Sequence, residues 1–157
     1  MALTQTSHQR SRPHVKSRAT LAGMRFDTKI AIAVRAGLAT WQQLNVTAFL
    51  ASGIAAGADE TIGKPYEDGT GNRYLGLFRQ PVLIYESSAA DLEAAHQRAL
   101  ERDLRIGIFT VDMFVTGNDD DNRAAVRDAA ELDFAGIAVY GPRNVVDKVF
   151  KGITLHP

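Results

Sequence analysis

The stretch KIAIAV at residues 29–34 decides the class of fold that this sequence predicts. A continuous apolar run of this kind is typical of a strand that is covered on both faces of its sheet. Similar runs recur at 82–85, 105–110 and 134–140, with helical patterns between and after them at about 41–56, 88–102, 119–130 and 142–151. Strands that alternate with helices of this length predict a three-layer α/β domain in which some strands pair in parallel.

Helix-capping and turn-forming residues support these boundaries. Polar residues that favour the starts of helices, and a proline suited to a first helical turn, stand where the helices are expected to begin: Thr40, Ser88, Asp119 or Asp120, and Pro142. The run Asp68-Gly-Thr-Gly71 separates two short extended segments and predicts a small β-hairpin. The predicted boundaries leave no room for a second folding unit between residues 24 and 157.

Composition limits the classes of function. The chain has 157 residues, 18 positive and 18 negative side chains, and no cysteine. The missing cysteines exclude a disulfide scaffold, thiolate metal sites and a cysteine nucleophile. Because there is no apolar run of about 20 residues and no apolar leader, we expect a cytoplasmic protein that does not enter a membrane.

Residues 1–23 differ from the rest and are predicted to be a disordered basic tail, followed by a single domain at 24–157. The tail contains four of the 18 basic side chains and none of the 18 acidic ones, so the remaining domain has a net charge of −4. A start at Met24, a solvated extension, and a basic arm that touches phosphates all fit this composition. A domain of negative charge argues against a nucleic-acid partner.

Ligands of open α/β sheets bind at the carboxyl ends of strands. The candidate ligand-binding residues near such positions are Arg35, Trp41, Gln42, Asn45, Arg79, Asn118 and Arg143, with Asp112 and Thr116 as candidate catalytic residues. A structural alternative exists for most of them, since amides satisfy loop backbone, a tryptophan anchors a helix, and acids favour a helix start. We expect no metal, because the acids at 119–121 lack a cation-loop pattern, and no cofactor, because no phosphate-binding glycine motif is present. His96 lies on an apolar helix stripe and is expected to be a residue at the edge of the core.

Three stretches carry a resemblance to a known family: residues 29–54, residues 66–85, and residues 109–126 together with 140–157. They resemble the bacterial DUF2000 family over almost all of residues 24–157, and that family is similar in fold to peptidyl-tRNA hydrolase II. The resemblance implies a three-layer α/β/α domain with a four-stranded mixed sheet in which one strand is antiparallel.

The departures from the hydrolases concern their catalytic side chains. Those enzymes have a lysine, a glutamine and a histidine on the first helix, and the matching positions here are Leu44, Ala48 and Ala51. Aliphatic side chains supply neither a proton nor a charge, so the resemblance predicts that peptidyl-tRNA hydrolysis is not the function. Another lysine, glutamine or histidine that reached the same cavity from elsewhere in the chain would overturn this prediction.

Three hypotheses follow for the function. The first is a module that binds a small molecule or a peptide, or an enzyme of unknown reaction, on this fold. The second is an aminoacyl-ester hydrolase of the peptidyl-tRNA type, with a rearranged site that uses Asp112 and Thr116. The third is a structural homodimer without a ligand, formed through the apolar first helix or through the hairpin at 66–78.

Overall fold

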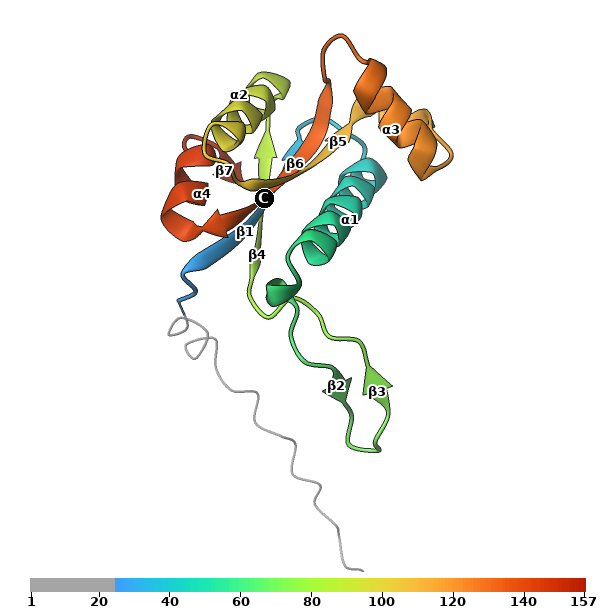
Figure 1. Cartoon of the computed structure of the whole chain (residues 1–157), viewed down its shortest axis with the longest axis vertical. Helices are drawn as coiled ribbons and strands as arrows, with labels where there is room; N and C mark the ends of the chain where they lie inside the picture. The colour runs from blue at the N-terminus through green and yellow to red at the C-terminus, as the bar shows by residue number, and fades with distance from the viewer. Residues whose placement is uncertain (1–24) are drawn as a thin grey trace, which may run out of the picture.

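A computed structural model of the chain describes residues 25–157. The predicted basic tail at 1–23 lies outside the described residues. The helices and strands follow one another in the predicted order (Figure 1). They are β1 (Thr28–Arg35), α1 (Thr40–Gly57), the 3-10 helix η2 (Asp59–Thr61), β2 (Tyr66–Glu67), β3 (Arg73–Tyr74), β4 (Val82–Ser87), α2 (Ala89–Leu100), β5 (Arg105–Thr110), the 3-10 helix η3 (Val111–Val115), α3 (Asp119–Asp128), β6 (Phe134–Pro142), α4 (Arg143–Val149) and β7 (Thr154–Leu155).

The main sheet has the strand order β5-β6-β1-β4-β7. The central strand β1 pairs in parallel with β4 and antiparallel with β6, and β5 pairs antiparallel with β6. The sheet is therefore mixed, as predicted, and β1, β4 and β5 run in one direction. The predicted number of four strands is wrong, because β7 pairs antiparallel with β4 as a fifth strand. A strand of two residues is too short to produce an alternating pattern in the sequence.

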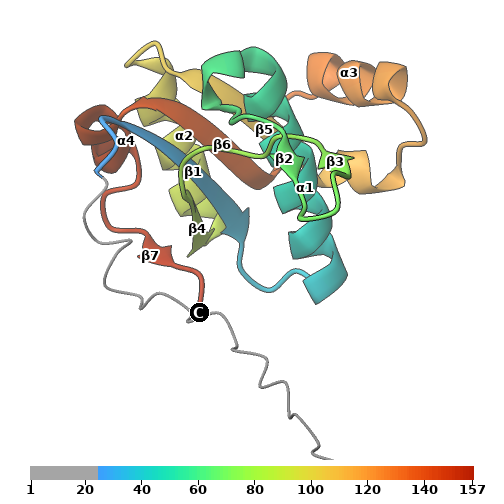
Figure 2. The same ribbon diagram turned by 90° about the horizontal axis from the view of Figure 1, so that it is seen from below.

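Helices cover both faces of the sheet (Figures 1 and 2). Ile30 and Ile32 of β1 pack with Val46 and Leu50 of α1 on one face. On the other face, Ala31 and Ala33 of β1 belong to a second core with residues of α2 and α4, which include Leu92, Val146 and Val149. Successive side chains of a strand point to opposite faces, so one apolar run supplies both cores.

Several helices have their N-cap one residue away from the predicted position. Ser88 caps α2 as predicted, and its side chain accepts a hydrogen bond from the Asp91 backbone N–H at 3.1 Å. The N-cap of α1 is Ala39 rather than Thr40, because the Gln42 side chain reaches back and accepts from the Ala39 N–H at 3.0 Å. The cap of α3 is Asn118 rather than an aspartate, and Pro142 is the last residue of β6, just before α4. These shifts leave each element in place.

The predicted hairpin is confirmed as the separate pair β2–β3, which projects from the body beyond the C-terminal end of α1 (Figure 1). Asp68 organises its turn by accepting hydrogen bonds from the backbone N–H groups of Thr70 and Asn72 at 2.9 and 3.0 Å, and from the Tyr74 hydroxyl at 2.7 Å. Hydrogen bonds from the side chains of Asn72, Tyr74 and Thr70 hold the pKa of Asp68 far below its usual range. The turn is therefore ordered although it is exposed.

None of the helices between residues 25 and 157 has both the length and the apolar character that crossing a bilayer requires.

Candidate functional site

The carboxyl ends of β1, β4 and β5 meet at one edge of the sheet, where the sequence predicted a ligand site. The backbone joins the first two of these ends, since the Ala36 N–H donates to the Ser87 carbonyl at 2.8 Å. Helix α1 begins four residues after Ala36 and places its first turns over this edge. Side chains from β1, β4 and α1 can therefore reach one another here.

Gln43 is the centre of a polar network at this edge. Its Nε2 donates to the Arg35 carbonyl and to Glu86 Oε1, both at 3.3 Å. Its Oε1 lies 3.3 Å from His156 Nε2, which makes this imidazole nitrogen the donor once the amide has both its N–H groups engaged. The network joins β1, β4, α1 and the segment after β7, and its members are partly buried.

The strand β7 delivers the histidine to this place. Tyr85 and Glu86 of β4 pair with Leu155 and Thr154, and the His156 backbone N–H donates to the Ile84 carbonyl at 2.9 Å. The second ring nitrogen of His156, Nδ1, lies 3.1 Å from the Pro157 carbonyl oxygen. The ring is thus held by its backbone on one side and by Gln43 on the other.

A cavity of about 350 Å³ adjoins the network. Its walls combine apolar side chains from strands and helix with a few polar groups: Val34, Thr40, Gln43, Leu44, Thr47, Ile84, His156 and Pro157. This volume is at the lower end of those that hold small organic ligands, which are typically about 300–1,000 Å³. An imidazole and an amide beside an apolar pocket can fix the orientation of a polar group, and the imidazole can also accept or donate a proton.

Four of the predicted residues lie at the same edge of the sheet, near the ends of β1 and β5. They are Arg35, Trp41, Asp112 and Thr116. Arg35 pairs with Asp133 at 2.6 Å, and Trp41 makes an edge-on contact with Phe114, with ring centroids 5.9 Å apart. Asp112 is exposed on η3, while Thr116 donates to the Met113 carbonyl at 2.9 Å and also bonds the Asn122 side chain. Trp41 is 61% exposed, so it is available to a ligand despite its contact with Phe114.

Other predicted residues have local structural contacts. Gln42 and Asn118 cap α1 and α3, as their hydrogen bonds to backbone N–H groups demonstrate. Ser52, also on α1, donates to the Phe49 carbonyl of its own helix at 2.6 Å. Asn45 is partly exposed on α1 and does not line the cavity beside His156. Gln42 and Asn45 therefore do not border the cavity beside His156.

Arg79 and Arg143 lie at the opposite edge of the sheet, and the prediction of one shared site with them is wrong. Arg79 precedes β4, which runs parallel to β1, so it lies at the amino end of these strands. Arg143 follows β6, which runs antiparallel to β1, so the carboxyl end of β6 lies beside Thr28 at the start of β1. Arg143 instead holds the chain before β1, since its Nε donates to the Phe26 carbonyl at 2.9 Å. No local pattern in the sequence indicates the direction of β6, and its antiparallel direction places Arg143 at the opposite edge of the sheet.

Sequence reasoning missed three of the residues that converge here: Gln43, Glu86 and His156. A signal for Gln43 existed, because it shares the buried stripe of α1 with Val46, Leu50 and Ile54 at helical spacing. Glu86 directly follows the buried run at 82–85. Gln43 and His156 line the same cavity as Leu44, one of the three aliphatic positions compared above with the hydrolase side chains.

Within residues 25–157, no three histidine, aspartate or glutamate side chains gather in a way that could hold a metal ion. His96 lies away from the network, on α2, with its ring centroid 4.6 Å from that of Phe134. Burial lowers the pKa of His96 below its usual value of 6.5.

The mixed sheet, the helices on both faces and the cavity at its edge define a mixed α/β domain with a candidate ligand site. The model of the family described as "Protein of unknown function (DUF2000)" matches residues 28–157, and the chain belongs to that family. The chain is also similar to a solved structure, the protein of unknown function Atu0240 from Agrobacterium tumefaciens strain C58. The identity is 44%, the TM-score is 0.81, and the match covers 85% of this chain and all of the other. No curated protein matches the sequence.

Proposed function

We propose that this chain is a peptidyl-tRNA hydrolase II-like domain that binds a small molecule or the end of a peptide in the cavity beside His156. The observation that carries the proposal is the convergence of Gln43 and His156, from distant segments, on one apolar-walled cavity, with Glu86 bonded to Gln43 beside it. Polar groups that converge beside an apolar pocket are the usual composition of a ligand site.

The hydrogen bonds of Gln43 suit a site that exchanges partners. All three contacts of its amide are 3.3 Å long, beyond the usual 2.9–3.0 Å for such bonds. A ligand group that forms shorter bonds with Gln43 or His156 replaces them at little cost. The walls formed by Val34, Leu44 and Ile84 favour an apolar part of the ligand.

A thermal-shift screen of metabolites and short peptides tests the proposal. A ligand at about 100 times its dissociation constant adds about 2.7 kcal/mol and raises the melting temperature by several degrees. We expect Gln43→Leu and His156→Ala to abolish the shift of any hit. Gln97→Leu, an exposed glutamine on α2, is the matched control and should keep it. A hit that survives both cavity variants but is lost in Gln97→Leu would contradict the proposed site.

A second candidate is hydrolysis of an aminoacyl ester, and the placement of an imidazole beside Leu44 favours it. Leu44 stands where the hydrolases have a helix lysine, and His156 lines the same cavity from the other end of the chain. Both ring nitrogens of His156 face acceptor oxygens, Nε2 that of Gln43 and Nδ1 the backbone oxygen of Pro157, so a neutral ring donates to only one of them. The other nitrogen would take a proton from an attacking water once it turns away from its oxygen.

Turnover of peptidyl-tRNA decides this candidate. A rate at or above about a tenth of that of a peptidyl-tRNA hydrolase, which falls about 10²–10⁴-fold in His156→Ala, would support it. A rate that His156→Ala leaves unchanged, or no turnover at all, would remove it and leave the binding proposal intact.

A further inference from the structure

Helix α1 is unusual for a helix at the surface of a protein. None of its 18 residues is charged, although only Val46, Leu50 and Ile54 are buried. Its outward side carries Trp41, which is 61% exposed, and Leu44, which is 67% exposed. Helices that are apolar on all sides are normally covered on all sides, and residues 25–157 leave the outward face of α1 without the cover that its composition requires.

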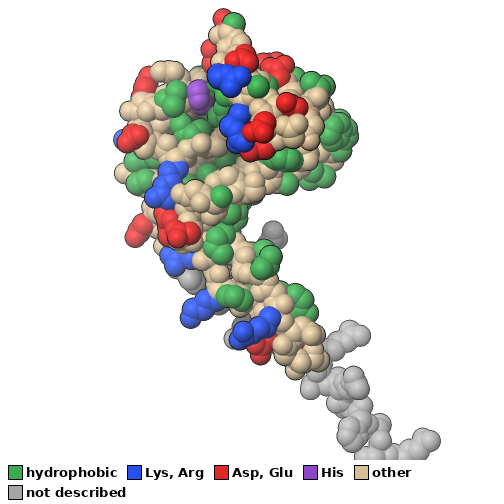
Figure 3. Space-filling model, turned by 45° about the vertical axis from the view of Figure 1, so that its right-hand side comes forward, with side chains coloured by type: hydrophobic (Ala, Val, Ile, Leu, Met, Phe, Trp, Pro, Cys, Tyr) green, Lys and Arg blue, Asp and Glu red, His purple; other side chains and the backbone are tan. Residues whose placement is uncertain are grey.

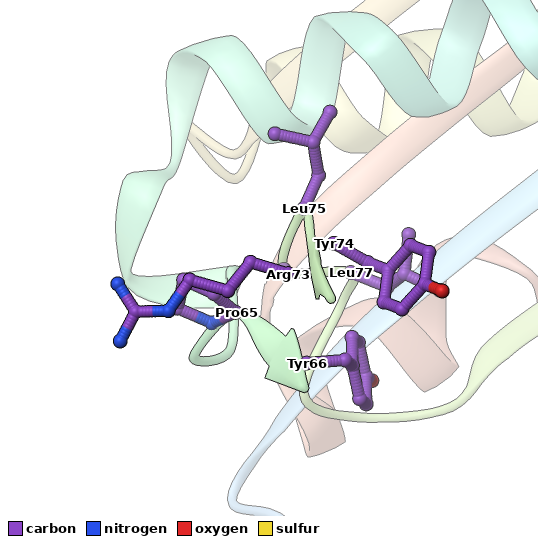
Figure 4. Close-up of a pocket in the computed structure, with 7 residues that line it drawn as sticks. Pro65, Tyr66, Arg73, Tyr74, Leu75 and Leu77 are labelled. Atoms are coloured by element: carbon purple, nitrogen blue, oxygen red, sulfur yellow. The ribbon is translucent and has the colours of Figure 1, made fainter. Parts of the chain in front are cut away.

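The hairpin continues this apolar surface. It follows α1 and η2 in the chain and projects beyond them, and hydrophobic side chains lie along it and on the body above (Figure 3). Tyr66, Tyr74 and Leu77 lie together on one side of the hairpin, and Leu75 points away from them (Figure 4). These four side chains are 52%, 53%, 64% and 87% exposed, in that order. A two-stranded hairpin is marginal by itself, and this one buries none of its large apolar residues in its own body.

The combined area is sufficient for a stable interface. We call the exposed side chains of α1 and of the hairpin the α1–hairpin surface; its large members are Trp41, Leu44, Phe49, Tyr66, Tyr74, Leu75 and Leu77. A large apolar side chain offers about 150–250 Å² when fully buried, and each of these is at least half exposed, so the members other than Leu75 expose on the order of 700 Å². A standard interface buries about 800 Å² on each partner.

We propose that the α1–hairpin surface binds the same surface of a second copy, so that two α1 helices pack across a two-fold axis while each hairpin extends over the partner molecule. A two-fold axis brings the residues that lie close to it near their own copies, so a charged residue there would face a like charge. The absence of charge from α1 removes that conflict. On the hairpin, Glu67 and Arg73 form a cross-strand pair that brings both signs to the rim.

The small outward residues of α1 set how closely the two helices approach. Ala48, Ser52 and Ala56 are exposed and follow one another at a spacing of four residues, along one line of the helix. Small side chains along this line allow the helix axes to approach to about 8 Å. The two-fold axis therefore crosses α1 near Ala48 and Ser52.

Oligomeric state tests the proposal directly. We expect the full chain to sediment as a dimer at micromolar concentration, and Ala48→Glu to raise the dimer dissociation constant by about 100-fold through repulsion of like charges. Ala94→Glu, an exposed alanine on α2 at the opposite face, is the matched control and should leave the dimer intact. A monomeric wild-type chain at 100 times this concentration, or a dimer broken by Ala94→Glu and not by Ala48→Glu, would overturn the proposal.

A cross-linking experiment keeps the proposal testable if the charged variant does not fold. The chain has no cysteine, so Ser52→Cys and Ala48→Cys each introduce a single thiol. Cα atoms within about 4.4–6.8 Å of each other form a disulfide, and we expect at least one variant to give a covalent dimer on mild oxidation. Leu100→Cys, at an exposed position on α2, should remain monomeric on the same gel. Cross-linking of Leu100→Cys alone would place the interface elsewhere.

Discussion

His96 is a single residue whose burial links stability to pH. Its ring packs on Phe134, and burial lowers the pKa of the folded form below 6.5. Between that lowered pKa and 6.5, the unfolded chain binds more protons than the folded one, so the free energy of unfolding rises with pH across this window. The contribution of neutral His96 is complete above pH 6.5 and is lost as the pH falls.

His96→Gln removes this titration. We expect urea unfolding between pH 7.5 and 5 to show a steeper fall in the free energy of unfolding for the wild-type chain than for the variant. The free energy of unfolding of the variant minus that of the wild-type chain should therefore increase as the pH decreases. Equal slopes for the two proteins would show that His96 does not titrate differently in the folded chain.

At the scale of residues, prediction from sequence succeeded where a side chain acts on its own neighbours in the chain. Ser88 caps α2 because its partner is Asp91, three residues away. Gln43 and His156 are 113 residues apart, and their contact depends on the pairing of β7 with β4. No local pattern encodes that pairing, so the centre of the candidate site was found only in three dimensions.

At the scale of elements, α1 approaches the sheet closely because β6 has a glycine beneath it. A Cβ atom built on Gly136 would lie 2.6 Å from Val46 Cγ1 and 2.9 Å from the Ala33 carbonyl oxygen. Gly136→Ala should therefore push α1 outward and lower the free energy of unfolding by about 1–3 kcal/mol. Gly53→Ala, within α1 and with open space around its Cβ, should instead stabilise the chain by about 0.5–1 kcal/mol. Denaturant unfolding of both variants checks the prediction, and equal signs would contradict it.

The directions of the strands were harder to predict than the strands themselves. The runs at 29–34 and 134–140 predicted β1 and β6, because apolar strands covered on both faces are continuous in sequence. Whether β6 runs with or against β1 depends on how the chain returns after α3, which these runs do not specify. This is why Arg143 was assigned to the wrong edge.

At the scale of the whole molecule, the α1–hairpin surface should make thermal stability depend on protein concentration. A dimer that unfolds to separated chains gains stability as the total concentration rises, whereas a monomer does not. Raising the concentration 100-fold should stabilise the dimer by about 2.7 kcal/mol per mole of dimer, about 1.4 kcal/mol per chain, and raise the melting temperature by several degrees. Ala48→Glu should remove this dependence while Ala94→Glu keeps it. A wild-type melting temperature that is constant over this range would mean that the outward face of α1 stays uncovered by a second copy.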